Sequence, residues 1–196
     1  MTPTNVEVPE VPIYEQIDGK PLFVKSYNQV VNGQSTVQES LPATPFQSIT
    51  LSCILAFFYE HLTPKHHLAP HEPALQVDPA TRLAVEIAVF ESAVLHSQQL
   101  INADGFQVAP ELAILMDCHV DLRQIRNPQN YFFQKIHKLL EFGVKEVIWL
   151  HSDTRKVTVA RSFDKWEVID WEKEIAVLEG NHSFSVAGLL AADGLL

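Results

Sequence analysis

Apolar residues occur in short runs separated by turn-forming residues, and the spacing inside each run predicts a mixture of strands and helices. In the N-terminal part, an Asp-Gly pair at 18–19 lies between the apolar segments 13–17 and 21–27. This arrangement predicts a β-hairpin. Apolar positions then wrap much of the surface of segment 46–61, which predicts a well-buried helix.

The middle of the chain has the clearest order of elements. The expected elements are a strand over 83–90, a strand over 106–116, a helix over 131–142 and a hairpin over 146–160. Glu86 stands in the middle of the first strand, and Gly143 directly follows the helix. A glycine at that place is typical of a helix C-terminus.

The remaining segments are shorter or more polar. They are an N-terminal arm over 1–12, loops over 28–47 and 63–74, a short strand over 75–77, a helix or loop over 91–103, strands near 166–171 and 175–178, and a C-terminal helix over 185–190. The order predicts a mixed sheet flanked by helices, in the α/β (α+β) class. One domain is expected over 13–196, since the length suits a single domain and no boundary is visible.

Composition and charge narrow the function classes. The formal net charge is -10, which opposes loose, charge-driven binding to nucleic acid, although a local basic groove is compatible with it. Cys53 and Cys118 form no CxxC pair and are expected to be reduced thiols. The longest apolar run, 54–59, is far shorter than the ~20 residues of a membrane span. We therefore expect a cytoplasmic protein that does not enter a membrane.

Acidic residues at two strands are the first candidates for chemistry. Side chains alternate along a strand, so Glu111, Leu115 and Asp117 are expected to share a face. Glu86 lies in the preceding strand, where a buried carboxylate needs a partner. Pairing of the two strands would let Glu86 and the Glu111 strand converge.

Lys135 shares the apolar stripe of its helix with Leu139 and Phe142, so a carboxylate on the sheet below is its expected partner. Oxygen ligands for Mg²⁺ or Mn²⁺ and a cation beside them would suit phosphodiester hydrolysis. The alternative is that Glu86 and Glu111 are solvated strand-end acids and that Lys135 extends along apolar surface to water.

Histidines are frequent in one segment and offer a second possible metal site. They are His61, His66, His67 and His71. Three prolines interrupt the same segment, and the histidines lack the i, i+4 order of a helical zinc pair. A flexible surface loop is the favoured interpretation of this segment.

Four motifs stand out along the chain: Tyr14-Glu15-Gln16-Ile17-Asp18-Gly19-Lys20, Val85-Glu86-Ile87-Ala88-Val89, Pro110-Glu111-Leu112-Ala113-Ile114-Leu115 and Lys135 eight residues before Gly143-Val144. They resemble motifs of the Uma-type restriction endonuclease family, within the PD-(D/E)XK nuclease superfamily. The resemblance covers roughly 13–190 and implies a restriction-endonuclease-like fold. Where the family has two aspartates and a second-strand glutamate, this chain has Glu86, Glu111 and Leu115.

The resemblance implies a set of roles. Glu86, Glu111 and Lys135 would be catalytic, with Glu86, Glu111 and Asp117 as ligands of Mg²⁺ or Mn²⁺. Glu15 and Gln134 would be accessory residues: Glu15 as a further acid, Gln134 as an amide oxygen. Leu115 cannot bind a metal, so the active site would be degenerate.

Two functions from different classes follow. The first is a Mg²⁺- or Mn²⁺-dependent endonuclease that hydrolyses nucleic acid. The alternative is a catalytically inactive nuclease-fold protein that acts as a binding or assembly module, which the net charge of -10 favours. A toxin–antitoxin or mobile-element partner protein is a weaker third possibility. A homodimer formed through the 146–160 hairpin and the Trp149 region is compatible with each.

Overall fold

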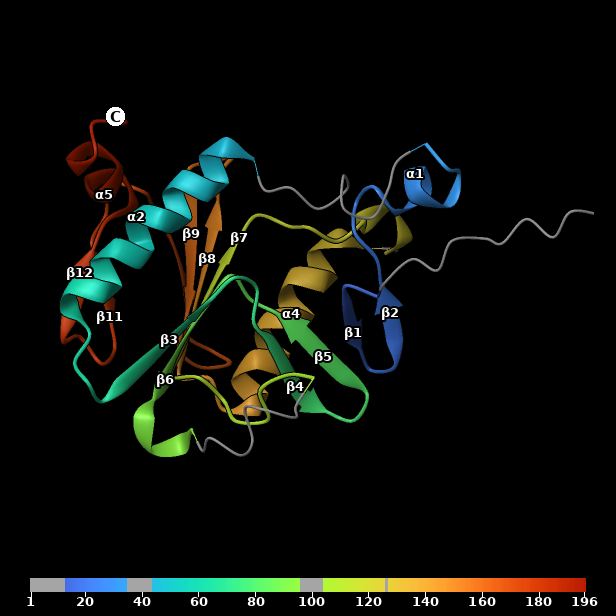
Figure 1. Ribbon diagram of the computed structural model, residues 1–196, viewed down its shortest axis with the longest axis horizontal. Helices are drawn as coiled ribbons and strands as arrows, with labels where there is room; N and C mark the ends of the chain where they lie inside the picture. Colours follow the sequence, from blue (N-terminus) through green and yellow to red (C-terminus); the bar gives the residue numbers. More distant parts are fainter. Residues whose placement is uncertain (1–12, 35–43, 96–103, 126) are drawn as a thin grey trace, which may run out of the picture.

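The computed structural model describes residues 13–34, 44–95, 104–125 and 127–196. Its larger sheet has six strands (Figure 1). In spatial order they are β10 (Trp166–Asp170), β9 (Lys156–Ala160), β8 (Glu146–His151), β7 (Leu112–Met116), β6 (Ile87–Glu91) and β3 (His66–Pro70). β7 and β8 are parallel and the other neighbours are antiparallel, so the sheet is mixed, as predicted.

A smaller sheet lies beside one end of the larger one (Figure 1). Its order is β2 (Lys20–Leu22), β1 (Glu15–Ile17), β5 (Thr81–Ala84) and β4 (Ala74–Asp78). The predicted N-terminal hairpin is present as β1 and β2, and Asp18 and Gly19 at its turn both have positive φ angles. The chain continues into the short helix α1 (Tyr27–Val31), which the sequence did not reveal.

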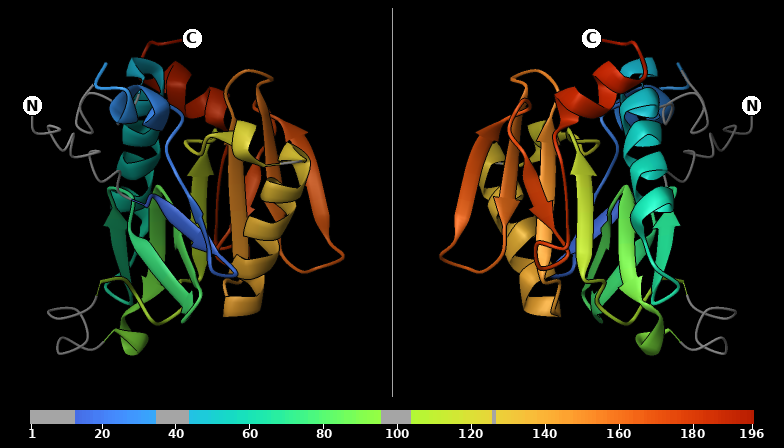
Figure 2. Two further views of the ribbon diagram at one scale, coloured as in Figure 1. Left: turned by 90° about the vertical axis from the view of Figure 1, so that its right-hand side faces the viewer. Right: turned by 90° about the vertical axis from the view of Figure 1, so that its left-hand side faces the viewer.

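Helices cover both faces of the larger sheet (Figure 2). α2 (Pro45–His61) and α5 (Val186–Ala192) lie on one face, and α4 (Pro128–Phe142) lies on the other. β7 divides its side chains between them: Ile114 and Met116 belong to the core under α2, whereas Ala113 and Leu115 belong to the core under α4. This alternation makes β7 a fully buried central strand. A separate hairpin of β11 (Ile175–Val177) and β12 (His182–Phe184) precedes α5.

Local sequence explains where the two long helices begin and end. Thr44 and Gln47 form a capping box at the start of α2, where each side chain accepts the other's backbone N–H. Gly143 ends α4 with a φ of 111°, a conformation that favours glycine. No helix in the described ranges has the length and apolarity needed to cross a membrane.

Three predicted segments differ from the structure. The prediction of a loop over 63–74 was wrong in part, because β3 lies in this segment and pairs with β6. Pro70 is the last residue of β3, which is an edge strand, and a proline is tolerated there. The expected strand over 83–90 is two strands in two sheets, and the chain crosses between them at Val85 and Glu86. The strand expected over 106–116 is regular only from Leu112. The predicted arm over 1–12 lies outside the described residues.

Trp149 does not offer an interface, which contradicts the predicted route to a homodimer. Its side chain is 1% exposed and packs between the sheet and α4. The hairpin that contains it supplies β8 and β9, two interior strands of the larger sheet. Trp149 itself could therefore not contact a second copy of the chain.

Candidate functional site

Lys135 of α4 is buried in the core and forms an ion pair with Glu15 of β1. The Nζ atom lies 2.5 Å from Oε1 of Glu15, and the two side chains are 5% and 0% exposed. The predicted contact between Lys135 and a carboxylate is therefore confirmed, but the partner comes from the smaller sheet. Glu15, expected as an accessory acid, is the counter-charge of the lysine.

Both carboxylate oxygens of Glu15 accept hydrogen bonds. Oε1 also accepts the backbone N–H of Ala84 at 3.0 Å, and Oε2 accepts the Tyr131 hydroxyl at 2.8 Å. Burial, together with the charge of Glu15, raises the pKa of Tyr131 well above its usual value, so this phenol stays protonated as a donor. A charge removed from water needs such partners, and here all of them belong to the chain itself.

A second ionisable pair lies where the chain crosses between the sheets. Oε1 of Glu86 lies 3.3 Å from Nε2 of His119, and Glu86 is 8% exposed. The other oxygen, Oε2, is buried and receives no hydrogen bond from the described residues. The carboxylate of Glu86 is thus only half satisfied, which is costly for a buried acid.

Leu115 of β7 belongs to the core under α4. Ile87 is opposite Ile114 across the β6–β7 ladder, which puts Glu86 next to Leu115, and Leu115 is in register with Trp149 of β8. The Lys135 ammonium lies 5.4 Å from the centre of the Trp149 ring. The 1% exposed, apolar Leu115 therefore stands beside Glu86 and Trp149 on the neighbouring strands, at the position where the resemblance expects a glutamate.

Glu111 lies away from this place. It precedes the opposite end of β7, where its carboxylate contacts Lys145 at 2.6 Å and His66 at 3.1 Å. Lys145 precedes β8, whose first residue is in parallel register with Leu112. Glu86 does lie beside the Glu111 strand, as expected, since its backbone N–H donates to Ile114. Glu111 itself is four positions before Leu115, the residue at the level of Glu86, so the two carboxylates are held apart.

Asp117 and Gln134 also point elsewhere. Asp117 has a φ of 55°, so the strand alternation stops there, and its carboxylate accepts bonds from Gln47 and from the backbone and hydroxyl of Ser152. These bonds link the end of β7 to the start of α2 and to the turn after β8. Gln134 is exposed on α4, whereas its neighbour Lys135 is buried.

The residues present do not fit the Mg²⁺ or Mn²⁺ ion that the resemblance implies. Across the four described ranges, no three His, Cys, Asp or Glu side chains are placed to share one metal ion. Near Lys135 the oxygens of Glu15 are already used, and Leu115 supplies no ligand. Beside this pair Glu86 keeps one buried oxygen that has no donor among the described residues, and one carboxylate does not hold a hard divalent cation.

Sequence reasoning missed His119 and Tyr131 as members of this cluster. His119 follows β7 after an irregular turn, and its neighbour Asp117 has a positive φ, so no period indicated its direction. Tyr131 could have been found, because it lies one helical turn before Lys135 and therefore on the same stripe.

The pKa of His119 gives a direct test of its contact with Glu86. The hydrogen bond with Glu86 raises this pKa, the charge of Glu72 adds to the rise, and burial and Lys135 oppose it. We expect Glu86→Gln to bring the pKa of His119 below the usual histidine value, since burial remains. In the wild type the pair's stabilisation is complete below the unfolded-state pKa and is lost as pH rises through the raised folded-state pKa.

Nuclear magnetic resonance titration of the histidine rings measures this change. His151 is the internal control, because burial lowers its pKa and Glu86 is not among the groups that act on it. A His119 pKa that is the same in wild type and Glu86→Gln would contradict the contact.

Comparison with known proteins adds one finding to this geometry. No family model matches the sequence, and no curated protein matches it. The chain is similar to a solved crystal structure from Anabaena variabilis, described as "a putative nuclease belonging to DUF820". The TM-score is 0.57 at 17% identity, over 77% of this chain and 83% of that one. This chain has a restriction-endonuclease-like fold. At such low identity the likeness concerns the nuclease fold and leaves the activity to be tested.

Proposed function

We propose that this chain uses a restriction-endonuclease-like fold for binding and that it does not hydrolyse phosphodiesters with a metal ion. The observation that carries this proposal is Leu115, a buried apolar residue beside Glu86 on the neighbouring strand, where the resemblance expects a glutamate. A metal-dependent nuclease needs several oxygen ligands around one metal ion, and the leucine side chain at this position contains no oxygen.

The state of Lys135 supports the same function. A catalytic lysine must act on substrate or on the attacking water, but this ammonium is 5% exposed and already paired with Glu15. The formal charge of -10 also disfavours a free nuclease, which gains association rate from basic surface. A structural ion pair therefore replaces the catalytic lysine.

The test is cleavage of plasmid and single-stranded DNA with Mn²⁺ by the wild type, Glu86→Gln and Lys135→Ala. We expect no cleavage above buffer by any of the three, and no rise of the wild-type melting temperature on adding Mn²⁺. Wild-type cleavage that disappears in both variants, with both still folded by circular dichroism, would instead establish a Mg²⁺- or Mn²⁺-dependent endonuclease with a degenerate site.

A further inference from the structure

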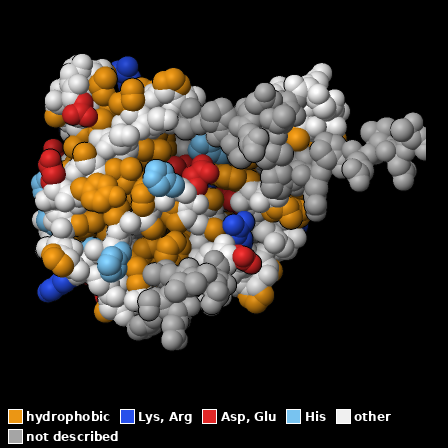
Figure 3. Space-filling view, viewed as in Figure 1, with side chains coloured by type: hydrophobic (Ala, Val, Ile, Leu, Met, Phe, Trp, Pro, Cys, Tyr) orange, Lys and Arg blue, Asp and Glu red, His pale blue; other side chains and the backbone are white. Residues whose placement is uncertain are grey.

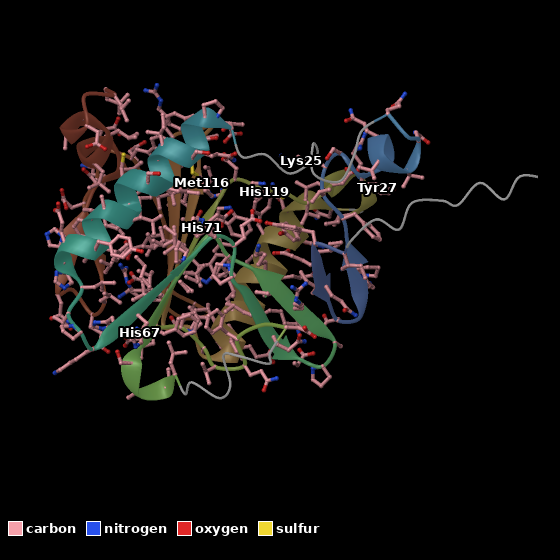
Figure 4. All side chains as sticks on the ribbon, in the orientation of Figure 1. Lys25, Tyr27, His67, His71, Met116 and His119 are labelled. Atoms are coloured by element: carbon pink, nitrogen blue, oxygen red, sulfur yellow. The ribbon has the colours of Figure 1, made fainter. Side chains whose placement is uncertain are left out.

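A cleft of about 420 Å³ opens beside Glu86, between α2 and the turn that joins β3 to β4. Figure 4 labels three of its lining residues, His71, Met116 and His119, which lie near the middle of the displayed face. In Figure 3 acidic and histidine side chains gather in this region, next to a broad apolar area over α2. The cleft thus has a polar side, with Glu86 and His119, and an apolar side formed by Leu51 and Leu55 of α2.

The described lining of this cleft holds two carboxylates and two histidines. Glu72 and Glu86 line it together with His71 and His119, and its described lining contains no lysine or arginine. Glu72 accepts a long bond from the Tyr14 hydroxyl, at 3.3 Å, and is exposed. A phosphate or carboxylate ligand would therefore be repelled, and a cation would be attracted.

The buried oxygen of Glu86 supplies the more specific signal. Glu86 is more than nine-tenths buried, and its Oε2 lacks a donor among the described residues. Ammonium and guanidinium groups carry several N–H donors and a positive charge, so they match what this carboxylate lacks. Leu51, Leu55 and Met116 line the same cleft and would pack against an alkyl stem.

α2 extends the apolar wall beyond the cleft. Among its 17 residues, Glu60 is the sole Asp, Glu, Lys or Arg. Tyr59, one helical turn after the lining residue Leu55, is 68% exposed. Surface helices normally present several charged residues to water, so an exposed helix with a single charged residue indicates a partner surface.

We propose that this cleft binds the side chain of an arginine or lysine carried by an apolar segment of a partner protein. This inference rests on the proposed binding function and names its ligand chemistry. The cation would reach the Glu86 carboxylate, its stem would lie along Leu51 and Leu55, and the flanking apolar residues would cover the outer face of α2.

The first test uses n-butylguanidinium as a probe of the cleft, with neutral n-butylurea as its isostere. The chain has two methionines, so methyl labelling gives two signals, and one of them is Met116 in the cleft. We expect saturable shifts of the Met116 methyl and the His119 ring with butylguanidinium and none with butylurea. Glu86→Gln should weaken binding at least about tenfold, equivalent to about 1.4 kcal/mol.

Glu60→Gln is the matched control, since it removes an acid from the same helix outside the cleft lining. It should leave the affinity within about twofold, a difference of less than 0.5 kcal/mol. Equal shifts with butylurea, equal binding by Glu86→Gln, or no shift at all would overturn the proposed cation site. The proposed function is tested by the DNA cleavage assay and the cation site by this titration. A negative titration would therefore overturn the cation site without overturning the proposed function.

A second arm tests the apolar part of the partner. The probe is acetyl-leucyl-arginyl-leucinamide, compared with the same tripeptide containing citrulline. We expect the arginine peptide to bind more tightly than butylguanidinium, and Tyr59→Ser to weaken the peptide but not butylguanidinium. A peptide that binds no better than butylguanidinium would exclude the partner segment and leave a small free cation as the ligand.

Discussion

Lys135→Met is expected to lower the free energy of unfolding by about 3–5 kcal/mol, because it strands a buried carboxylate without its counter-charge. Glu15 is 0% exposed and would keep only the Ala84 N–H and the Tyr131 hydroxyl as donors. Methionine preserves most of the side-chain volume, so the loss would report charge and not a cavity. Denaturant titration followed by circular dichroism measures it.

Lys138→Met is the matched control one turn along α4. Lys138 contacts Asp18 at 2.8 Å, but Asp18 is 60% exposed, and a surface pair of this kind contributes about 0–1 kcal/mol. The double variant Glu15→Gln with Lys135→Met should be more stable than Lys135→Met alone, since the unpaired charge is gone. Equal losses for Lys135→Met and Lys138→Met would show that the buried pair is not a stabilising contact.

Leu115→Glu is expected to produce the second large effect, a folded state that depends on Mn²⁺. The new carboxylate would be buried next to Glu86, so stability in EDTA should fall by several kcal/mol. Two neighbouring carboxylates could then share a cation, and a ligand present at 100 times its dissociation constant restores about 2.7 kcal/mol. Melting temperature against Mn²⁺ concentration gives the result, with wild type showing no such dependence.

Leu112→Glu controls for the burial of a charge anywhere in β7. Leu112 is as buried as Leu115 but belongs to the other core and lies three residues away. It should be destabilised without recovery in Mn²⁺. If Mn²⁺ stabilises both variants, the metal effect is not specific to position 115. If Mn²⁺ stabilises neither variant, the leucine at position 115 is not the reason that the wild type lacks a metal site. If Leu115→Glu does not fold, Leu115→Gln offers an amide oxygen without the charge.

Periodicity predicted α4 and the inward direction of Lys135. The helical stripe shared by Lys135 and Leu139 predicted that Lys135 points inward and meets a carboxylate, and both statements agree with the structure. The β8–β9 hairpin and the capped helix α2 were also predictable, since their signals are local.

Periodicity could not predict the register between strands, and therefore not which strand ends lie side by side. Glu111 and Leu115 were assigned the same face, but a face does not specify position along the sheet, and the pairing of Glu111 with Lys145 depends on the β7–β8 register. Asp117 left that face because of its left-handed backbone. The crossing at Glu86 was hidden, because the apolar run 83–90 continues through two different sheets.

The separation of Glu15 and Lys135 in the chain has a consequence for the order in which the molecule is made. The two residues are 120 positions apart. At about 5–20 residues per second, a ribosome needs roughly 6–24 s to travel from one codon to the other. Throughout that interval the N-terminal hairpin has no counter-charge for its inward acid, so its final position is reached late, after α4 has been synthesised. A nascent chain stopped before α4 would keep the hairpin accessible to proteases and chaperones.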